Sequence, residues 1–301
     1  MSPTTVHCFS YLAATHTLHV DDYPKINYGV EVHATDRFMA GDGPLIAGML
    51  TALGHPAALF SNPVADDPDG HTITARLQDW GVRHHPAPGT VAYTRVNTVI
   101  ADQAGNRTWF SGLNGITSEL DGIAPRVFAA APTVYLDCYE VLGETPRPLL
   151  DAALRARRRV VVNLGGSPVP AWMRAAVQPH GRVSVLQSNA DEHHPAQAEQ
   201  TLRELTELAV ADLVVVTVGR NGAIGRTHTG EFFAVPALAV VVHQVQGAGS
   251  AFSAALVHAL CQGAAAEQAA SFACRAGSLW CSRTPHGPLP TLVDLQSHQL
   301  G

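Results

Sequence analysis

A glycine-rich stretch near the C-terminal end of the chain, QGAGSAF at residues 246–252, has the composition of an anion-binding turn. Gly247 and Gly249 carry no side chain, so a negatively charged ligand could approach the backbone N–H groups closely. The helix expected from Ser250 would add the partial positive charge of its N-terminus, which favours phosphate-like groups. The same sequence is also typical of a plain turn into a helix, and serine is a good N-cap, so spacing alone leaves both interpretations open.

Three other segments place glycines or polar side chains where strands and helices should meet. AGDGPLIAGMLTALG (40–54) is a second glycine-rich turn into a helix, and a buried strand runs into a glycine-rich turn within residues 214–237. Asn189 and Glu192 follow another strand, and such side chains can hold a hydrated Mg²⁺ near phosphates. In open α/β sheets ligands bind beyond the carboxyl ends of the strands, which is where these segments fall. Taken singly, each is equally typical of a turn or a helix cap.

The elements that must position these residues alternate between apolar strands and helices. The strand segments lack polar alternation, which indicates a parallel sheet covered on both faces. Strand–helix alternation over this length implies right-handed crossovers in a doubly wound sheet with helices on both faces. Strands are expected at 6–13, 57–62, 133–138, 159–165, 183–188 and 212–219, and helices at 44–54, 69–81, 146–158, 170–178, 196–209, 248–263 and 265–283.

Two regions, residues 15–39 and 91–112, break this pattern and alternate like exposed antiparallel strands. ADQAGNRT (101–108) has the turn chemistry of a hairpin. We expect these regions to form a small β-sheet lid within a single α/β domain spanning residues 1–301. Alternating apolar residues in VEVHATDRF (30–38) would suit a homodimer paired through the lid, and a free-standing lid fits nearly as well.

The bulk composition excludes several classes of protein. The 301 residues are 46% hydrophobic and 15% charged, which fits a packed core rather than a disordered chain. The net charge is −6 and Lys25 is the only lysine, so no basic surface for nucleic acid is expected. No apolar run reaches the length of a membrane span. No secretion signal is recognisable, and five cysteines without a CxxC pair predict reduced thiols in a cytoplasmic protein.

The order of the segments along the whole chain resembles the PfkB/ribokinase family of carbohydrate and nucleoside kinases. The motifs that carry the resemblance are the two glycine-rich turns, the N-x-x-E and T-x-G-x-x-G-A patterns, LGHPAALFSNPVADDPDG (53–70), AGNRTWF (104–110) and FACRAGSLWCSRTPHGPLP (272–290). The resemblance implies a ribokinase-like α/β fold with a β-sheet lid. It also implies transfer of the γ-phosphoryl group of ATP, with Mg²⁺, to a hydroxyl of a sugar- or nucleoside-like acceptor.

The resemblance also implies roles for individual residues. An anion hole is implied at Gly247, Ala248 and Gly249. Binding of ATP or ADP is implied for Asn189, Glu192, Thr217, Gly219, Gly222 and Cys274, with Glu192 holding Mg²⁺ indirectly. Binding of the acceptor is implied for Thr15, Gly41, Gly43, Leu45 and Arg107.

The chain departs from the family pattern at the residues that handle the acceptor. The family's aspartate that takes the hydroxyl proton is replaced by Ser250, and another usual aspartate by Gln244. The position of the family's aspartate that binds sugar hydroxyls falls at or near Thr15. The position of its asparagine that also binds the sugar falls at Leu45. A serine is not a base near neutral pH, and an apolar Leu45 would leave buried sugar hydroxyls unpaired, so a conventional sugar kinase is disfavoured.

Three hypotheses are compatible with these departures. The first is a kinase homologue that binds nucleotide or phosphate and has impaired or lost sugar phosphorylation. The second is an active kinase for an unusual, less polar acceptor, with His16, His19, His243 or the substrate itself supplying the base. The third is altered chemistry in which Ser250 is a nucleophile beside the anion hole; the sequence identifies no partner base, and a contact between Ser250 and a histidine would support this hypothesis.

Overall fold

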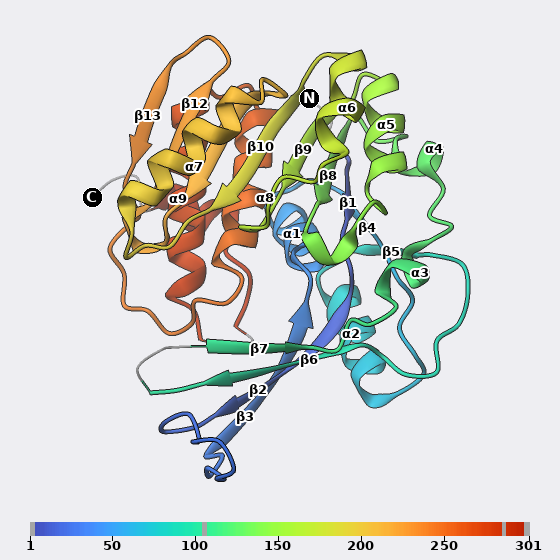
Figure 1. The fold of residues 1–301 in the computed structure, drawn as a ribbon, viewed down its shortest axis with the longest axis vertical. Helices are drawn as coiled ribbons and strands as arrows, with labels where there is room; N and C mark the ends of the chain where they lie inside the picture. The colour runs from blue at the N-terminus through green and yellow to red at the C-terminus, as the bar shows by residue number, and fades with distance from the viewer. Residues whose placement is uncertain (1–3, 104–106, 285–286, 298–301) are drawn as a thin grey trace.

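A computed structural model describes residues 4–103, 107–284 and 287–297 of the chain. Within these residues, nine strands form a central sheet in the order β13-β12-β11-β10-β9-β8-β1-β4-β5 (Figure 1). In this sheet the strands β11, β10, β9, β8, β1, β4 and β5 run parallel, and β12 and β13 close one edge antiparallel. The strands are β1 (Val6–Phe9), β4 (Ala57–Ser61), β5 (Arg83–Pro86), β8 (Thr133–Asp137), β9 (Arg159–Asn163), β10 (Val183–Asn189), β11 (Ala211–Thr217), β12 (Ala223–Thr227) and β13 (Phe232–Val235).

Helices cover both faces of this sheet, which explains the uninterrupted apolar strands. In β9, Val160 and Val162 pack into one core and Val161 into the other. One face carries α1 (Asp42–Ala52), α2 (Pro68–Asp79), α8 (Ala248–Cys261), α9 (Ala266–Cys281) and α10 (Leu292–Ser297). The other carries α3 (Ile116–Leu120), α4 (Pro125–Phe128), α5 (Arg147–Arg155), α6 (Met173–Val177) and α7 (Pro195–Glu207). Short 3₁₀ turns lie at Glu140–Leu142, Gln178–His180 and Gly219–Asn221.

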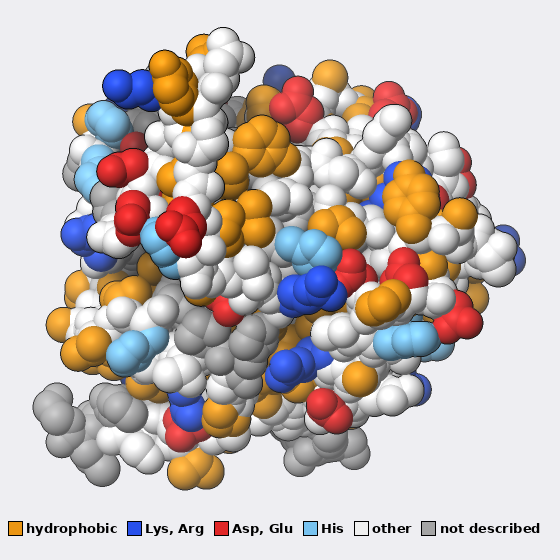
Figure 2. All heavy atoms as spheres, turned by 90° about the horizontal axis from the view of Figure 1, so that it is seen from below, with side chains coloured by type: hydrophobic (Ala, Val, Ile, Leu, Met, Phe, Trp, Pro, Cys, Tyr) orange, Lys and Arg blue, Asp and Glu red, His pale blue; other side chains and the backbone are white. Residues whose placement is uncertain are grey.

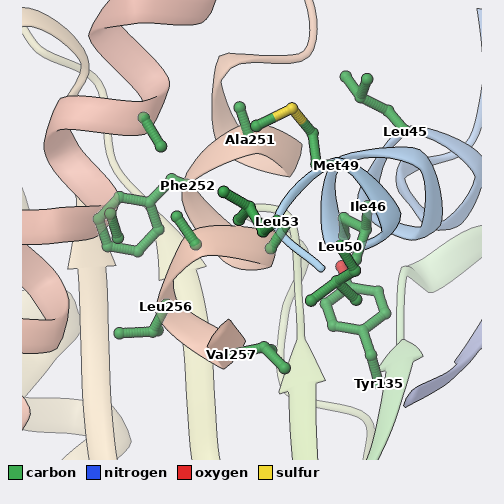
Figure 3. Close-up of a cluster of buried hydrophobic side chains, with 14 of the residues drawn as sticks. Leu45, Ile46, Met49, Leu50, Leu53, Tyr135, Ala251, Phe252, Leu256 and Val257 are labelled. Atoms are coloured by element: carbon green, nitrogen blue, oxygen red, sulfur yellow. The ribbon is translucent and has the colours of Figure 1, made fainter. Parts of the chain in front are cut away.

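Helices α1 and α8 lie against each other over the sheet, although about 200 residues separate them in the chain. Met49 of α1 points toward Ala251 of α8, and Leu50 lies beside Tyr135 of β8 (Figure 3). This apolar contact holds the N-termini of the two helices close together, and those termini form one wall of the candidate site. Among the described residues, no helix combines the length and the apolar character needed to cross a bilayer.

A second sheet of four strands lies across one end of the core as a lid (Figure 1). Its order is β3-β2-β6-β7, from β2 (Ala13–His19), β3 (Ala34–Ala40), β6 (Val96–Ala101) and β7 (Arg107–Ser111). Two sequence expectations differ from this sheet. Strands β2 and β6 pair parallel rather than antiparallel, and the strand expected from Val30 begins only at Ala34 because residues 30–33 lie exposed outside the sheet. The expected hairpin tip at 104–106 lies outside the described residues. Seen from the lid end, hydrophobic and charged side chains are interspersed on the surface (Figure 2).

Candidate active site between the lid and the core

A pocket of about 170 Å³ lies between the lid sheet and the N-termini of α1 and α8. The lid strands β2, β3, β6 and β7 each contribute to its lining, as does the turn that precedes α8. The lining residues are Tyr11, Thr15, Phe38, Met39, Ala40, Gly41, Asp42, Leu45, Asn97, Trp109, Gln246, Gly247 and Ser250.

Gly41 allows α1 to begin at the edge of this pocket. Its backbone φ is +91°, in the region that side chains other than glycine rarely adopt. A Cβ atom at this position would collide with the carbonyl oxygen of Tyr11. The glycine therefore lets the chain leave β3, pass close to the end of β1 and present Asp42 in the first turn of α1.

Ser250 is buried and its hydroxyl donates a hydrogen bond to a carboxylate, not to a histidine. Ser250 Oγ lies 2.9 Å from Asp42 Oδ1. The other oxygen, Asp42 Oδ2, accepts hydrogen bonds from Asn163 Nδ2 at 3.1 Å and from the Tyr139 hydroxyl. Burial raises the pKa of Asp42, and the three hydrogen bonds from Tyr139, Ser250 and Asn163 oppose that rise. Sequence reasoning missed Asp42; the available signal was an acid in the first turn of a helix that opens on a glycine-rich motif.

A second carboxylate, Asp137, lies directly behind Asp42 and has no solvent exposure. It accepts a hydrogen bond from the Tyr135 hydroxyl at 2.6 Å, and others from Ser10 Oγ and the backbone N–H of Asp42. Burial, and secondarily the neighbouring charge of Asp42, raise the pKa of Asp137 to about 8 against the opposing effect of its hydrogen bonds. The site therefore holds two buried acids whose ionisation is coupled.

The glycine-rich turn before α8 leaves its backbone open. Gly247 has φ +86° and is the N-cap of α8, and no side chain within the described residues caps this helix. Gly249 is exposed, and a Cβ added there would meet nothing within 4 Å. The Trp280 indole N–H donates to the Gln246 carbonyl at 2.7 Å and fixes the turn from behind. The start of α8, at Ala248, therefore presents open backbone to the space beside the pocket.

The residues implied for nucleotide binding lie at the carboxyl ends of neighbouring strands. Asn189 and Thr217 are register partners at the ends of β10 and β11. Glu192 accepts from the Arg220 guanidinium at 2.6 Å and from its backbone N–H at 2.8 Å, which lowers the pKa of Glu192 against the opposing effect of its burial. Gly219 and Gly222 complete the turn after β11 with φ of +50° and +89°. Cys274 is buried in α9, and burial raises its pKa to about 12.

The structure gathers only part of the residues implied for the acceptor. Thr15, Gly41 and Leu45 line the pocket together with Ser250. Gly43 instead packs against Ser10, since a Cβ there would press on the Ser10 side chain.

Arg107 lies outside the pocket lining, where burial lowers its pKa and the Cys281 thiol is its charge neighbour. The three histidines considered as bases are also absent from the lining of the described pocket. His16 and His19 contact Asp69 and Asp36 at 2.9 and 2.7 Å, and His243 is exposed. Among the described residues, no group of three or more acidic, histidine or cysteine side chains could hold a metal ion directly.

A doubly wound core under a β-sheet lid, with a glycine-rich helix start at their junction, defines a protein of the ribokinase-like class. Residues 6–291 match the model of the pfkB family of carbohydrate kinases, and the chain belongs to this family. No curated protein matches the chain significantly.

Several solved structures share the fold at low sequence identity. A ribokinase from Giardia lamblia is 15% identical with a TM-score of 0.80, and the match covers 99% of each chain. Arabidopsis thaliana ribokinase, in a complex with ribose and ATP, is 18% identical with a TM-score of 0.78 over 100% of each chain. A Burkholderia thailandensis nucleoside kinase in complex with inosine is 16% identical with a TM-score of 0.75, covering 98% of this chain and 96% of that one.

Proposed function

We propose that this chain is an ATP-dependent kinase that phosphorylates a hydroxyl of a small molecule held between the lid and the core. The observation that carries the proposal is the 2.9 Å contact between Ser250 Oγ and Asp42 Oδ1 in the pocket. A carboxylate thus lies one hydrogen bond away from the position of the family's usual base. It comes from α1 instead of α8.

Asp42 is the group that takes the acceptor proton in this proposal. Because Ser250 donates its own hydrogen to Asp42, the lone pairs of Ser250 Oγ are left to accept from the acceptor hydroxyl. As the acceptor oxygen forms its bond to phosphorus, its proton moves to Ser250 Oγ and the Ser250 proton moves to Asp42 Oδ1. Burial raises the pKa of Asp42 above that of an exposed aspartate, which makes its carboxylate a stronger base.

ATP with Mg²⁺ would supply the phosphoryl group, and the chain offers residues that fit its phosphates. The open backbone at Gly249 and the N-terminus of α8 suit an anion. Asn189 and Thr217 extend from adjacent strand ends in the region where nucleotide contacts are expected. Glu192 is already paired with Arg220, so its role toward Mg²⁺ would run through water.

A second candidate is a homologue that binds nucleotide without transferring phosphate. The observation in its favour is that the Asp42 carboxylate already accepts three hydrogen bonds, from Ser250, Asn163 and Tyr139. Hydrogen bonds to the charged form reduce the basicity of a carboxylate. In this case the pocket would sense a ligand without reacting with it.

Two measurements on the same variants separate these functions. Calorimetry with Mg·ATP reports nucleotide binding, and ADP formation with a panel of small alcohols, ribose and inosine reports phosphoryl transfer. We expect Asp42→Asn to retain nucleotide affinity and to lose turnover by at least about a hundred-fold, the lower end of general-base effects. Asp69→Asn is a matched control, because Asp69 is also in a helix first turn but pairs with His16 outside the pocket.

The outcomes are distinct. Nucleotide binding without turnover of any acceptor by the wild type would favour the second candidate. Turnover that survives in Asp42→Asn would contradict the assigned role of Asp42. Absence of nucleotide binding at millimolar concentration would contradict both candidates.

We also propose that two copies pair through the lid. Large apolar side chains are exposed there, with Ile26 88%, Tyr28 75% and Phe110 58% exposed. Pairing of the lid edges would bury them. Sedimentation at micromolar concentration should give the mass of a dimer, and a monomer mass would overturn this arrangement.

A further inference from the structure

Two buried polar side chains of the lid line the pocket, and one atom of each has no hydrogen-bond partner among the described residues. Thr15 on β2 and Asn97 on β6 are register partners in neighbouring parallel strands, so their side chains stand side by side on one face of the lid. Thr15 is 1% exposed and Asn97 is 5% exposed, and both line the pocket. Thr15 Oγ1 and Asn97 Oδ1 have no hydrogen-bond partner within the described part of the chain. Buried polar groups are normally paired, so a ligand is the natural partner.

The neighbouring Tyr11 fixes which end of the Asn97 amide faces the pocket. The Tyr11 hydroxyl oxygen accepts from the Asn97 side chain and from the Gly41 backbone N–H. Because only the amide nitrogen of Asn97 can donate, Asn97 Nδ2 faces Tyr11 and Oδ1 is left for a ligand. Asn97 therefore offers an acceptor, and Thr15 offers a hydroxyl that can donate beside it.

The rest of the wall is mostly apolar and limits what can bind. Phe38 is the register partner of Thr15 on the other side, and Leu45 and Trp109 also line the pocket. A polyol would bury hydroxyls against these side chains without partners, which is costly. The volume of about 170 Å³ is below the roughly 300–1,000 Å³ typical of pockets for drug-sized ligands, which suits a single ring.

We propose that the acceptor is a flat, single-ring alcohol with an amide-like edge. Its ring N–H donates to Asn97 Oδ1, its adjacent carbonyl accepts from Thr15 Oγ1, and its hydroxyl faces Ser250. The assignment of that hydroxyl as the phosphorylated group rests on the proposed kinase function. Recognition of the edge concerns binding alone and can be measured separately.

Calorimetry with three probes tests whether Thr15 and Asn97 recognise the amide-like edge of a ligand. Hydroxymethyluracil carries the edge and one hydroxyl, benzyl alcohol carries the hydroxyl without the edge, and ribose is a polyol. We expect hydroxymethyluracil to bind at least ten-fold more tightly than either of the others. Thr15→Val and Asn97→Leu, which keep the approximate side-chain size, should each weaken that binding roughly five-fold or more and leave benzyl alcohol unaffected. Thr98→Val is the control, because Thr98 follows Asn97 on β6, faces the opposite side of the lid and is absent from the pocket lining.

Tighter binding of ribose, failure of all three probes to bind, or unchanged selectivity in both Thr15→Val and Asn97→Leu would overturn the inference. Both variants remove an unpaired buried polar atom, so they should unfold no more easily than the wild type, and denaturation curves will show whether lost binding reflects lost folding. ADP formation reports the kinase function independently. Selective binding of hydroxymethyluracil without ADP formation would support recognition of the amide-like edge and contradict the proposed kinase function. Turnover of ribose in preference to hydroxymethyluracil would support the kinase function and contradict recognition of the amide-like edge.

Discussion

Exchanging Asp42 and Ser250, which meet at the junction of α1 and α8, tests how their carboxylate supports turnover and stability. The exchange shows whether a carboxylate is needed on α1, or whether one on α8 serves equally well. In the wild type, Asp42 and Ser250 are joined by a 2.9 Å hydrogen bond. The double variant Asp42→Ser with Ser250→Asp still brings one carboxylate and one hydroxyl together. The carboxylate exchanges the N-terminus of α1 for that of α8, so a stabilisation of about 0.3–1 kcal/mol from a helix N-terminus is kept. We therefore expect the exchange to preserve the pair, whereas each single substitution destroys it.

The two single variants should fail for different physical reasons. Ser250→Asp alone brings two carboxylates into contact, and unit charges about 4 Å apart at an effective dielectric constant of about 20 repel by about 4 kcal/mol. One of them then takes up a proton, so its pKa in the folded state lies above that of the unfolded chain. The lost stability should be largest at alkaline pH and should return as pH falls toward 4. Asp42→Ser alone leaves two hydroxyls and no base, so turnover should fall by roughly 10²–10⁴-fold with little change in stability.

Urea unfolding of the wild type, both single variants and the double variant at pH 5 and pH 8 measures this coupling. We expect the double variant to recover at pH 8 most of the unfolding free energy that Ser250→Asp loses. Turnover, once an acceptor is found, should recover in the double variant relative to Asp42→Ser. Additive effects of the two substitutions, with no coupling energy, would refute the claim that the two side chains meet.

Three further predictions concern the surroundings of the site. Because the pKa of Asp137 is raised to about 8, its own contribution to stability is fully present below pH 3.8 and is lost as pH rises through 8. Asp137→Asn should therefore remove this component of the alkaline decline in urea unfolding, and an unchanged slope between pH 5 and pH 8 would contradict the assignment. Burial, and secondarily the charge of His55, lower the pKa of His258 to about 4, so the contribution of the neutral imidazole to stability is fully present above pH 6.5 and is lost as pH falls toward 4; His258→Gln should reduce this acid-side loss in urea unfolding. Gly247→Ala forces a side chain into φ +86° with its Cβ 2.5 Å from Leu45, and should cost about 1–2 kcal/mol in unfolding experiments and weaken Mg·ATP binding in calorimetry.

The fold could be predicted because its signals are local. Apolar strands without polar alternation, separated by helices that end near glycine, leave few arrangements other than a covered parallel sheet. Local sequence signals failed where contacts with other parts of the chain decide whether a segment forms a strand. VEVH (30–33) alternates like a strand but lies exposed before β3 begins at Ala34, and the first apolar run breaks at Phe9, after which Ser10 turns to donate to Asp137.

The candidate site was predictable only where a motif marks it. The glycine-rich turn at Gly247, with Ser250 just after it, stands out in the sequence. Asp42 does not, because its partner Ser250 is 208 residues away and the contact depends on the packing of α1 against α8. The Thr15–Asn97 pair depends likewise on a parallel register between two lid strands, which no local pattern specifies.

The substitution at Ser250 and the acid at Asp42 are best understood together. An aspartate at position 250 would lie against Asp42 and raise the charge of a region that already holds Asp137. With serine there, the site keeps one carboxylate at the pocket and one behind it, connected through the backbone N–H of Asp42. Two coupled buried acids destabilise a fold, and perturbed groups of this kind concentrate where chemistry is done. A pocket that had merely lost its function would have no need of Asp42 at all, since an apolar side chain there would pack at lower cost. The buried acid at Asp42 is therefore the main physical argument for the proposed reactive site.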